Sequence, residues 1–178
     1  MKMYIVLGRF QPFHNGHVHL IETAMELGPT TIVIGSAQES WTFDNPFSGD
    51  ERKDMIQEWL GDKEAKIVQI EDINDPPNWV EHTTKIHGEG TLVTSDESTK
   101  LLYEQAGFPV IWVEMNKRES LEGWRVRTTL KMLSTVMDDE AQKQILSQSI
   151  PESVVDWLIE NDALHRFYEL SRDLSHAG

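Results

Sequence analysis

The chain has 178 residues, 39% of them hydrophobic, no cysteine and a formal net charge of −14. This length suits one buried core, so we expect a single domain. Without cysteine, disulfide bonds and thiolate catalysis are excluded, and a metal would need oxygen or imidazole ligands. The 30 acidic residues against 16 basic ones disfavour a polymeric nucleic acid as partner, whereas a few arginines in a cleft can still bind a small phosphorylated ligand.

The chain shows no sign of membrane insertion or export. No apolar stretch approaches the roughly 18 residues that a membrane helix needs, and the N-terminus lacks the charged-then-apolar pattern of a signal peptide. We therefore expect a cytoplasmic protein with no membrane partner.

Five short apolar runs alternate with amphipathic segments in the first two thirds of the chain. The runs predict buried strands at 3–8, 30–36, 65–70, 91–95 and 109–115. Helical spacing follows at 15–27, 49–60, 78–87 and 98–106, with Gly28, Gly61 and Gly107 as helix stops. This alternation predicts an α/β fold, namely a Rossmann-like, doubly wound, five-stranded parallel sheet.

The last third of the chain carries only helical patterns. They run from Arg125 onward, and a final segment begins at Pro151, with a break expected near Asn161 and Asp162. The apolar stripe of that segment predicts packing on the sheet or on a neighbouring subunit. Its members are Val154, Val155, Leu158, Ile159 and Leu164.

The segment "GRFQPFHNGH", residues 8–17, directly follows the first predicted strand. In open α/β sheets a ligand lies at the carboxyl ends of the strands, where the amides of the first helix favour an anion. His14 and His17 would present two imidazoles there, Gly16 permits close approach, and Arg9 adds a permanent cation. Phosphoryl or nucleotidyl transfer suits this set, because it needs positioning and charge stabilisation. A single such histidine would more simply be a capping residue.

This segment resembles the signature of the HxGH nucleotidyltransferase superfamily, and in its full form that of archaeal-type nicotinamide-nucleotide (NMN) adenylyltransferases. Those enzymes join NMN to the AMP part of ATP, giving NAD and pyrophosphate. The segment "IGSAQESWTFDNPFSGDERKDMI" is similar to the family's second block, and "NWVEH" and "IPESVVDWL" to further segments. The resemblance implies an α/β nucleotide-binding core over 1–116, a helical part over 117–178, Mg²⁺ brought with ATP, and a homo-oligomer.

The resemblance also implies roles for individual residues. Trp79 would stack on the nicotinamide ring, since a cationic pyridinium gains dispersion and cation–π attraction on an indole face, although tryptophan at a helix start is more often core. Arg52 would point into the cleft, although it is also explained as a first-turn residue paired with an acid. The implied sets are His14, His17 and Arg127 for catalysis; Gly8, Arg9, Phe10, Gly16, Gly35, Ser36, Arg52, Gly123 and Arg125 for ATP; and Trp79, Asn78 and Asp72 for NMN.

One segment departs from the family pattern. Where the family has a Ser-Gly-Thr turn followed by two residues and an arginine, this chain reads "EGWRVR", with Glu122 and Trp124 in place of the hydroxyl residues. At about 5 Å and an effective dielectric of about 20, the new carboxylate would repel a phosphate charge by about 3 kcal/mol. Arg125 can neutralise Glu122 and contact phosphate itself, Glu122 can hold Mg²⁺, or the site can bind nucleotide without turnover. We favour the first, because the histidine segment and Arg52 are intact.

Two other functions fit the same residues. The acceptor can be another phosphorylated metabolite, such as nicotinate mononucleotide or phosphopantetheine, in an adenylyl or cytidylyl transfer. Alternatively, the protein can be a non-catalytic nucleotide or NAD sensor that acts through its C-terminal helices.

Overall fold

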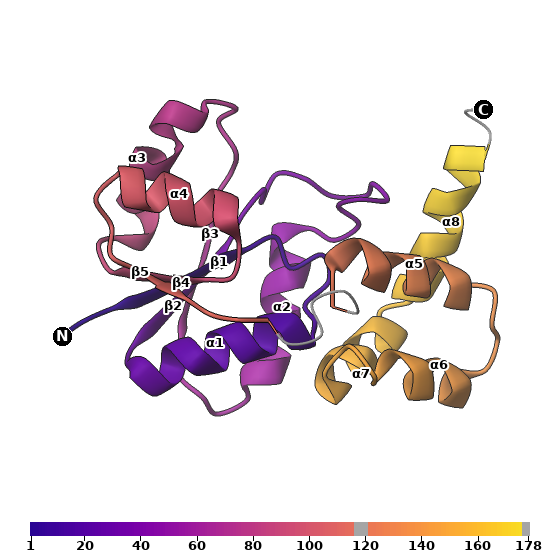
Figure 1. The fold of residues 1–178 in the computed structure, drawn as a ribbon. Coiled ribbons are helices and arrows are strands. Elements are labelled where there is room, and N and C mark those ends of the chain that lie inside the picture. Colours follow the sequence, from indigo (N-terminus) through magenta and orange to yellow (C-terminus); the bar gives the residue numbers. More distant parts are fainter. Residues whose placement is uncertain (116–120, 176–178) are drawn as a thin grey trace. The chain divides into compact units, whose positions relative to one another are not determined.

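The computed structural model describes residues 1–115 and 121–175, and its central element is a five-stranded sheet (Figure 1). The strands are β1 (Tyr4–Gly8), β2 (Thr30–Ile34), β3 (Lys66–Gln69), β4 (Thr91–Thr94) and β5 (Val110–Trp112). Every neighbouring pair is parallel, and the order across the sheet is β3-β2-β1-β4-β5. The predicted doubly wound, Rossmann-like α/β fold is confirmed.

The helices begin and end close to the predicted positions. They are α1 (Asn15–Leu27), α2 (Gly49–Leu60), α3 (Pro76–His87), α4 (Glu97–Gln105), α5 (Gly123–Leu133), α6 (Asp139–Leu146), α7 (Glu152–Glu160) and α8 (Ala163–Ser175). Helix α3 begins two residues earlier than predicted, because proline suits a first helical turn. The predicted break at Asn161 and Asp162 is confirmed, since it separates α7 from α8. No helix within the described ranges is long and apolar enough to cross a membrane.

The chain forms two compact units. The first contains residues 1–9, 17–38 and 62–115, and the second contains residues 10–16, 39–61 and 121–175. The predicted border between 116 and 117 lies outside the described residues. The helical unit thus takes two segments from the N-terminal half of the chain, which a single border cannot express.

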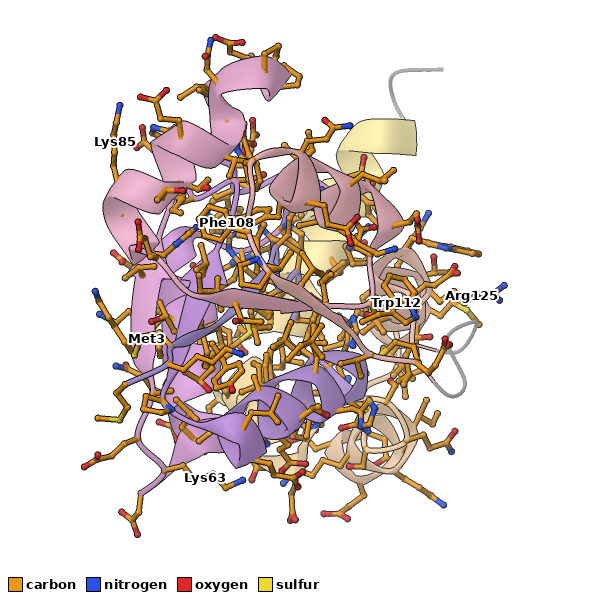
Figure 2. All side chains as sticks on the ribbon, turned by 60° about the vertical axis from the view of Figure 1, so that its left-hand side comes forward. Met3, Lys63, Lys85, Phe108, Trp112 and Arg125 are labelled. Carbon is orange, nitrogen blue, oxygen red and sulfur yellow. The ribbon has the colours of Figure 1, made fainter. Side chains whose placement is uncertain are left out.

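The first unit is the parallel sheet with helices on its two faces. Figure 1 shows α3 and α4 on one side of the strands and α1 on the other. Lys63 and Lys85 point outward in Figure 2. Lys63 pairs with Glu22 at 3.3 Å, and Lys85 pairs with Glu81 at 3.0 Å. One cluster of buried side chains in the core of this unit contains five aliphatic residues and a tyrosine. The members are Ile5, Val33, Ile70, Val80, Leu92 and Tyr103.

The second unit is built of helices around an aromatic core. Helix α7 packs against α2, α6 and α8, while α5 packs against α6 and α8. Phe47 and Phe167 are both fully buried, with ring centres 6.1 Å apart. The apolar stripe predicted for the final segment is largely buried here, since Val154, Val155 and Leu158 lie inside the unit.

The start of α2 is fixed by a side-chain cap. Ser48 is the N-cap residue, and its hydroxyl accepts a hydrogen bond of 3.1 Å from the Glu51 amide. This bond satisfies one of the amides that a helix leaves without an intrahelical partner. It therefore fixes the point from which the helix presents Arg52.

Replacement of Ser48 by alanine should lower the free energy of unfolding by about 1 kcal/mol, because one amide of α2 loses its cap. Urea denaturation followed by circular dichroism measures this loss. Ser147→Ala is the control, since Ser147 ends α6 as its C-cap residue and its backbone, not its hydroxyl, makes the capping bonds. Equal stability of the Ser48 variant and the native chain would contradict the assignment of the cap.

Candidate functional site

The carboxyl ends of β1 and β2 lie side by side in the first unit. The Gly35 amide donates a hydrogen bond of 2.9 Å to the Gly8 carbonyl, so the two strand ends stay paired beyond the sheet. Arg9 follows β1 and is exposed. Ser36 has a positive φ of 48°, a conformation that non-glycine residues adopt rarely and often at functional sites. Three of the predicted ATP-binding residues, Gly8, Gly35 and Ser36, thus meet at one edge of the sheet.

Asp72 joins this edge from the segment after β3. The Ser36 hydroxyl donates to Asp72 Oδ2 at 2.6 Å, and the Asp72 amide donates to Gln38 Oε1 at 3.0 Å. Bonds to a carboxylate are stronger than neutral ones, so this pair fixes the two segments against each other. A residue predicted to bind NMN is therefore bonded to one predicted to bind ATP.

A small pocket of about 240 Å³ lies beside Trp79. Trp79 packs edge-on against Tyr103, with ring centres 6.2 Å apart. Asn78 does not line this pocket; its amide donates to Asp75 Oδ2 at 2.7 Å instead. Two of the three predicted NMN-binding residues thus border one cavity. The lining residues are Asp72, Asn74, Asp75, Pro76, Trp79, Thr99 and Leu102.

In the second unit, the side chain of Gln11 joins the histidine segment to the second motif. Gln11 is 3% exposed; its Nε2 donates to the Phe47 carbonyl at 2.8 Å, and its Oε1 accepts from the Phe47 amide at 2.9 Å. Arg127 Nη1 donates to the Gln11 carbonyl at 3.0 Å. The adjacent Phe10 has a positive φ of 55° and is buried. Three sequence-distant segments are thereby held at Gln11.

His14 is buried and carries a defined tautomer. It is 5% exposed, and the Gly16 amide donates to its Nδ1 at 3.1 Å, so the ring proton of the neutral form resides on Nε2. Burial lowers the pKa of His14 to about 4, and the Arg127 guanidinium adds to this shift. At neutral pH, His14 is therefore an uncharged N–H donor, and a permanent cation lies near it.

His17 lies in the first turn of α1, which begins at Asn15, directly after His14. It is half-buried, whereas His19, two residues further on, is exposed. His17 therefore lies at the amino end of a helix, where backbone amides and the helix dipole favour an anion.

Arg52 is buried in the first half of α2. Its Nε donates to the Ser48 carbonyl at 3.1 Å, and its Nη2 donates to the Glu39 carbonyl at 3.4 Å. Its exposed fraction is 0%, which is rare for arginine unless the side chain is paired. The guanidinium thus joins the segment before α2 to the first turn of that helix.

The departure "EGWRVR" forms the start of α5. Glu122 is the N-cap residue; its carboxylate accepts from Trp124 Nε1 at 2.5 Å and lies 3.8 Å from Arg125 Nε. The Arg125 guanidinium stacks 4.5 Å from the centre of the Trp124 ring. The ion pair between Arg125 and Glu122 that the first of the three accounts requires is thus present, and contact of Arg125 with phosphate stays a prediction. A Cβ on Gly123 would lie 3.0 Å from Arg127 Nη1, so glycine gives that guanidinium room.

Glu122 belongs to no cluster of metal-ligating side chains. Within the described ranges, no group of three or more His, Cys, Asp or Glu residues is arranged to hold a metal ion.

Two residues of the second unit went unnoticed in the sequence. Gln11 is a lone polar residue between Phe10 and Pro12, and its polarity inside a buried run was the available signal. Arg166 pairs with Glu51, donates to the Pro46 carbonyl at 3.0 Å and stacks 4.1 Å from the centre of the Trp41 ring. No local pattern marks Arg166, because its partners lie more than 100 positions away.

Comparison with known proteins gives consistent results. The family model described as cytidylyltransferase-like matches residues 5–150. The nicotinamide-nucleotide adenylyltransferase of Picrophilus torridus is 32% identical over 176 residues, covering 96% of this chain and 98% of its own. That of Haloarcula marismortui is 32% identical over 169 residues, covering 93% and 85%.

A solved structure has the same fold. It is a bifunctional NMN adenylyltransferase/ADP ribose pyrophosphatase from Francisella tularensis, complexed with AMP and a manganese ion. The TM-score is 0.70 at 19% sequence identity, over 98% of this chain. The present chain spans about half the length of that protein, 53%.

His14 should make stability depend on pH. Its folded-state pKa of about 4 lies below the ordinary 6.5, so the unfolded chain binds the proton more readily. The stabilisation is complete above pH 6.5 and is lost as the pH falls toward 4, by about 3 kcal/mol for a shift of this size.

Urea denaturation at pH 7 and pH 4 of the native chain and of His14→Gln measures this effect. Between pH 7 and pH 4, the native chain should lose about 3 kcal/mol more unfolding free energy than the His14→Gln variant. The exposed His19→Gln should show no such change. A His14 ring that titrates near 6.5 by NMR would contradict the burial argument.

Proposed function

Because the chain belongs to the cytidylyltransferase-like family, we propose that it transfers AMP from ATP to NMN, forming NAD and pyrophosphate. The resemblance predicted from the histidine segment is confirmed by the family and by the relatives, so this protein is a nucleotidyltransferase. The observation that carries the proposed chemistry is that Arg127, which donates to the Gln11 carbonyl, lies near enough to the uncharged His14 to help lower its pKa.

In the proposed reaction, a phosphate oxygen of NMN attacks the α-phosphorus of ATP in line. One P–O bond forms, the bond from the α-phosphorus to the bridging oxygen breaks, and pyrophosphate leaves with that electron pair. No covalent enzyme intermediate forms. His14 Nε2–H and His17 would donate to phosphate oxygens, while Arg9, Arg52 and Arg127 would offset the growing charge on the leaving group.

The residues proposed for ATP binding would contribute mainly backbone groups and positive charge. Gly8, Phe10, Gly16, Gly35 and Ser36 would line the nucleotide site. Gly123 and Arg125, at the start of α5, would meet the triphosphate.

A divalent cation, for which we propose Mg²⁺, would arrive bound to ATP and neutralise part of the phosphate charge. This agrees with the manganese ion in the Francisella tularensis protein.

For NMN, we propose the pocket beside Trp79 as the site of the nicotinamide ring. An indole face attracts a cationic pyridinium through dispersion and cation–π terms, and Asp72 adds a carboxylate at the pocket edge. Asn78 would act only from the neighbouring turn. A pantetheine acceptor gains little from an indole, which makes NMN the better fit.

The proposal extends to the cellular setting of the protein. A cytoplasmic location, a role in NAD biosynthesis and a homo-oligomer fit such an enzyme. A nucleotide or NAD sensor without turnover is the alternative, and tight NAD binding without catalysis in calorimetry would favour it.

Incubation with ATP, Mg²⁺ and NMN at millimolar concentrations should yield NAD, measured by a coupled dehydrogenase assay. His17→Ala should reduce kcat by about 100-fold or more, because a donor to the charge of the transition state is lost. His19→Ala, two residues along α1, should leave kcat unchanged. A folded native chain that forms no NAD would overturn the proposed reaction.

Trp79→Ala should raise the KM for NMN by about tenfold while leaving the KM for ATP unchanged, since stacking on a cation is worth up to about 2 kcal/mol in a desolvated site. Steady-state kinetics with each substrate varied in turn separates the two constants. Trp112→Ala is the matched control, because Trp112 lies on β5 outside this pocket. An unchanged KM for NMN in the Trp79 variant would move the nicotinamide site elsewhere.

A further inference from the structure

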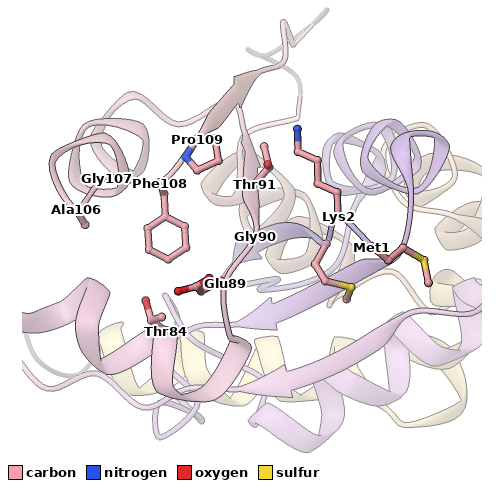
Figure 3. Close-up of a pocket in the computed structure, with 11 residues that line it drawn as sticks. Met1, Lys2, Thr84, Glu89, Gly90, Thr91, Ala106, Gly107, Phe108 and Pro109 are labelled. Carbon is pink, nitrogen blue, oxygen red and sulfur yellow. The ribbon is translucent and has the colours of Figure 1, made fainter.

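A second, larger pocket lies at the opposite edge of the sheet from Gly8 and Ser36, within the first unit. Its volume is about 530 Å³, within the range of small-molecule sites. Residues before β1 and β4 form one side, and residues of α3 and after α4 form the other (Figure 3). The lining residues are Met1, Lys2, Met3, Thr84, Glu89, Gly90, Thr91, Ala106, Gly107, Phe108 and Pro109.

The polar groups at one end of this pocket are mostly hydrogen-bond acceptors. Glu89 forms none of the ion pairs found among the described residues. In Figure 3 its carboxylate points toward the side where Thr84 and Phe108 lie. The Thr84 hydroxyl donates its proton to the Val80 carbonyl at 2.6 Å, so its oxygen can only accept from a ligand.

Two helix ends add to the negative potential. Helices α3 and α4 end at His87 and Gln105, and the segments that follow both of them line the pocket. The carboxyl end of a helix carries a partial negative charge and favours a cation. Glu89, just beyond the end of α3, therefore lies in a field that already favours positive charge.

Two lysines lie near the pocket, and one of them, Lys2, lines it. The Lys2 ammonium lies 5.6 Å from the centre of the Tyr4 ring, and Lys85 pairs with Glu81 at 3.0 Å. Neither lysine forms an ion pair with Glu89 within the described residues, so the Glu89 end of the pocket keeps its negative charge, although the charged Lys2 also lines the pocket.

The rest of the wall is apolar, with one unsatisfied hydroxyl. Phe108, Pro109 and Met3 contribute apolar surface, and Figure 3 shows the Phe108 ring directed into the space above Thr84. Thr91 is 2% exposed, and its Oγ1 has no hydrogen-bond partner in the described part of the chain. Buried polar atoms of this kind are rare and are commonly satisfied by water or a ligand.

We propose that this pocket is a second ligand site, separate from the nucleotide site, for a small organic cation with an apolar body. The ammonium group would donate to the Glu89 carboxylate and the Thr84 hydroxyl beside the π face of Phe108. The apolar body would cover Met3 and Pro109. Glu89 and the two helix ends disfavour an anion of the same shape at this end of the pocket.

Three probes that share a phenyl body test the charge preference: 2-phenylethylammonium, 2-phenylethanol and phenylacetate. The protein carries ¹³C-methyl methionine, and Met3→Leu assigns the reporter signal. The ammonium should shift the Met3 methyl signal in a saturable way at millimolar concentration, the alcohol more weakly, and phenylacetate not at all.

Glu89→Gln should weaken binding of the ammonium by about fivefold, the scale of a partly exposed ion pair, and leave the alcohol unaffected. Glu104→Gln is the matched control, since it removes the same charge from exposed α4 without touching the pocket. Equal affinity for all three probes, no saturable shift, or equal weakening by both substitutions would overturn the proposal. Because the readout is binding at Met3, it stands apart from the outcome of the NAD assay.

Discussion

The candidate site depends on one buried amide side chain. Gln11 makes two hydrogen bonds to the backbone of Phe47, and its own carbonyl receives Arg127. The Gln11 side-chain amide bonds both the N–H and the C=O of Phe47, as a neighbouring strand would. Breaking either bond in the dry interior would leave a buried polar group without a partner, which is costly. Ser48 follows Phe47 directly and caps the helix that carries Arg52. This contact therefore links the segments that carry His14, Arg52 and Arg127.

Burial removes the charge of His14 but not that of the arginines. A buried imidazole loses its charge far more readily than a guanidinium, whose pKa stays above about 12. His14 thus supplies direction through its Nε2–H, whereas Arg127 and Arg52 supply positive charge. The arrangement has a further consequence for a bound polyanion. Phosphate oxygens beside His14 would favour its protonated form, opposing the effect of Arg127, so nucleotide binding and proton binding at this ring would be coupled.

The sequence predicts the sheet, α1 and α2 well, because these depend on local signals: apolar runs, a serine cap and glycine stops. It also brings Asp72 and Trp79 to one pocket through the turn before α3. It does not predict the division into two units, since that rests on distant contacts such as Arg166 with Glu51 and α2 with α7. Nor does it predict that Asn78 lies outside the pocket, with its side-chain amide bonded to Asp75 in the same turn. Interactions within one turn or across a hundred residues leave no periodic trace.

The segment "EGWRVR" offsets the negative charge of Glu122 within its own turn. Glu122 occupies the N-cap position, where the helix dipole favours a carboxylate, and the Trp124 indole and the Arg125 guanidinium both lie against its Oε2. With one carboxylate and two guanidinium groups, residues 122–127 carry a formal charge of +1. The repulsion estimated for an isolated Glu122 is therefore opposed within the same turn. Arg127, held at Gln11, keeps its place whatever group stands at position 122, because its anchor lies in another segment of the chain.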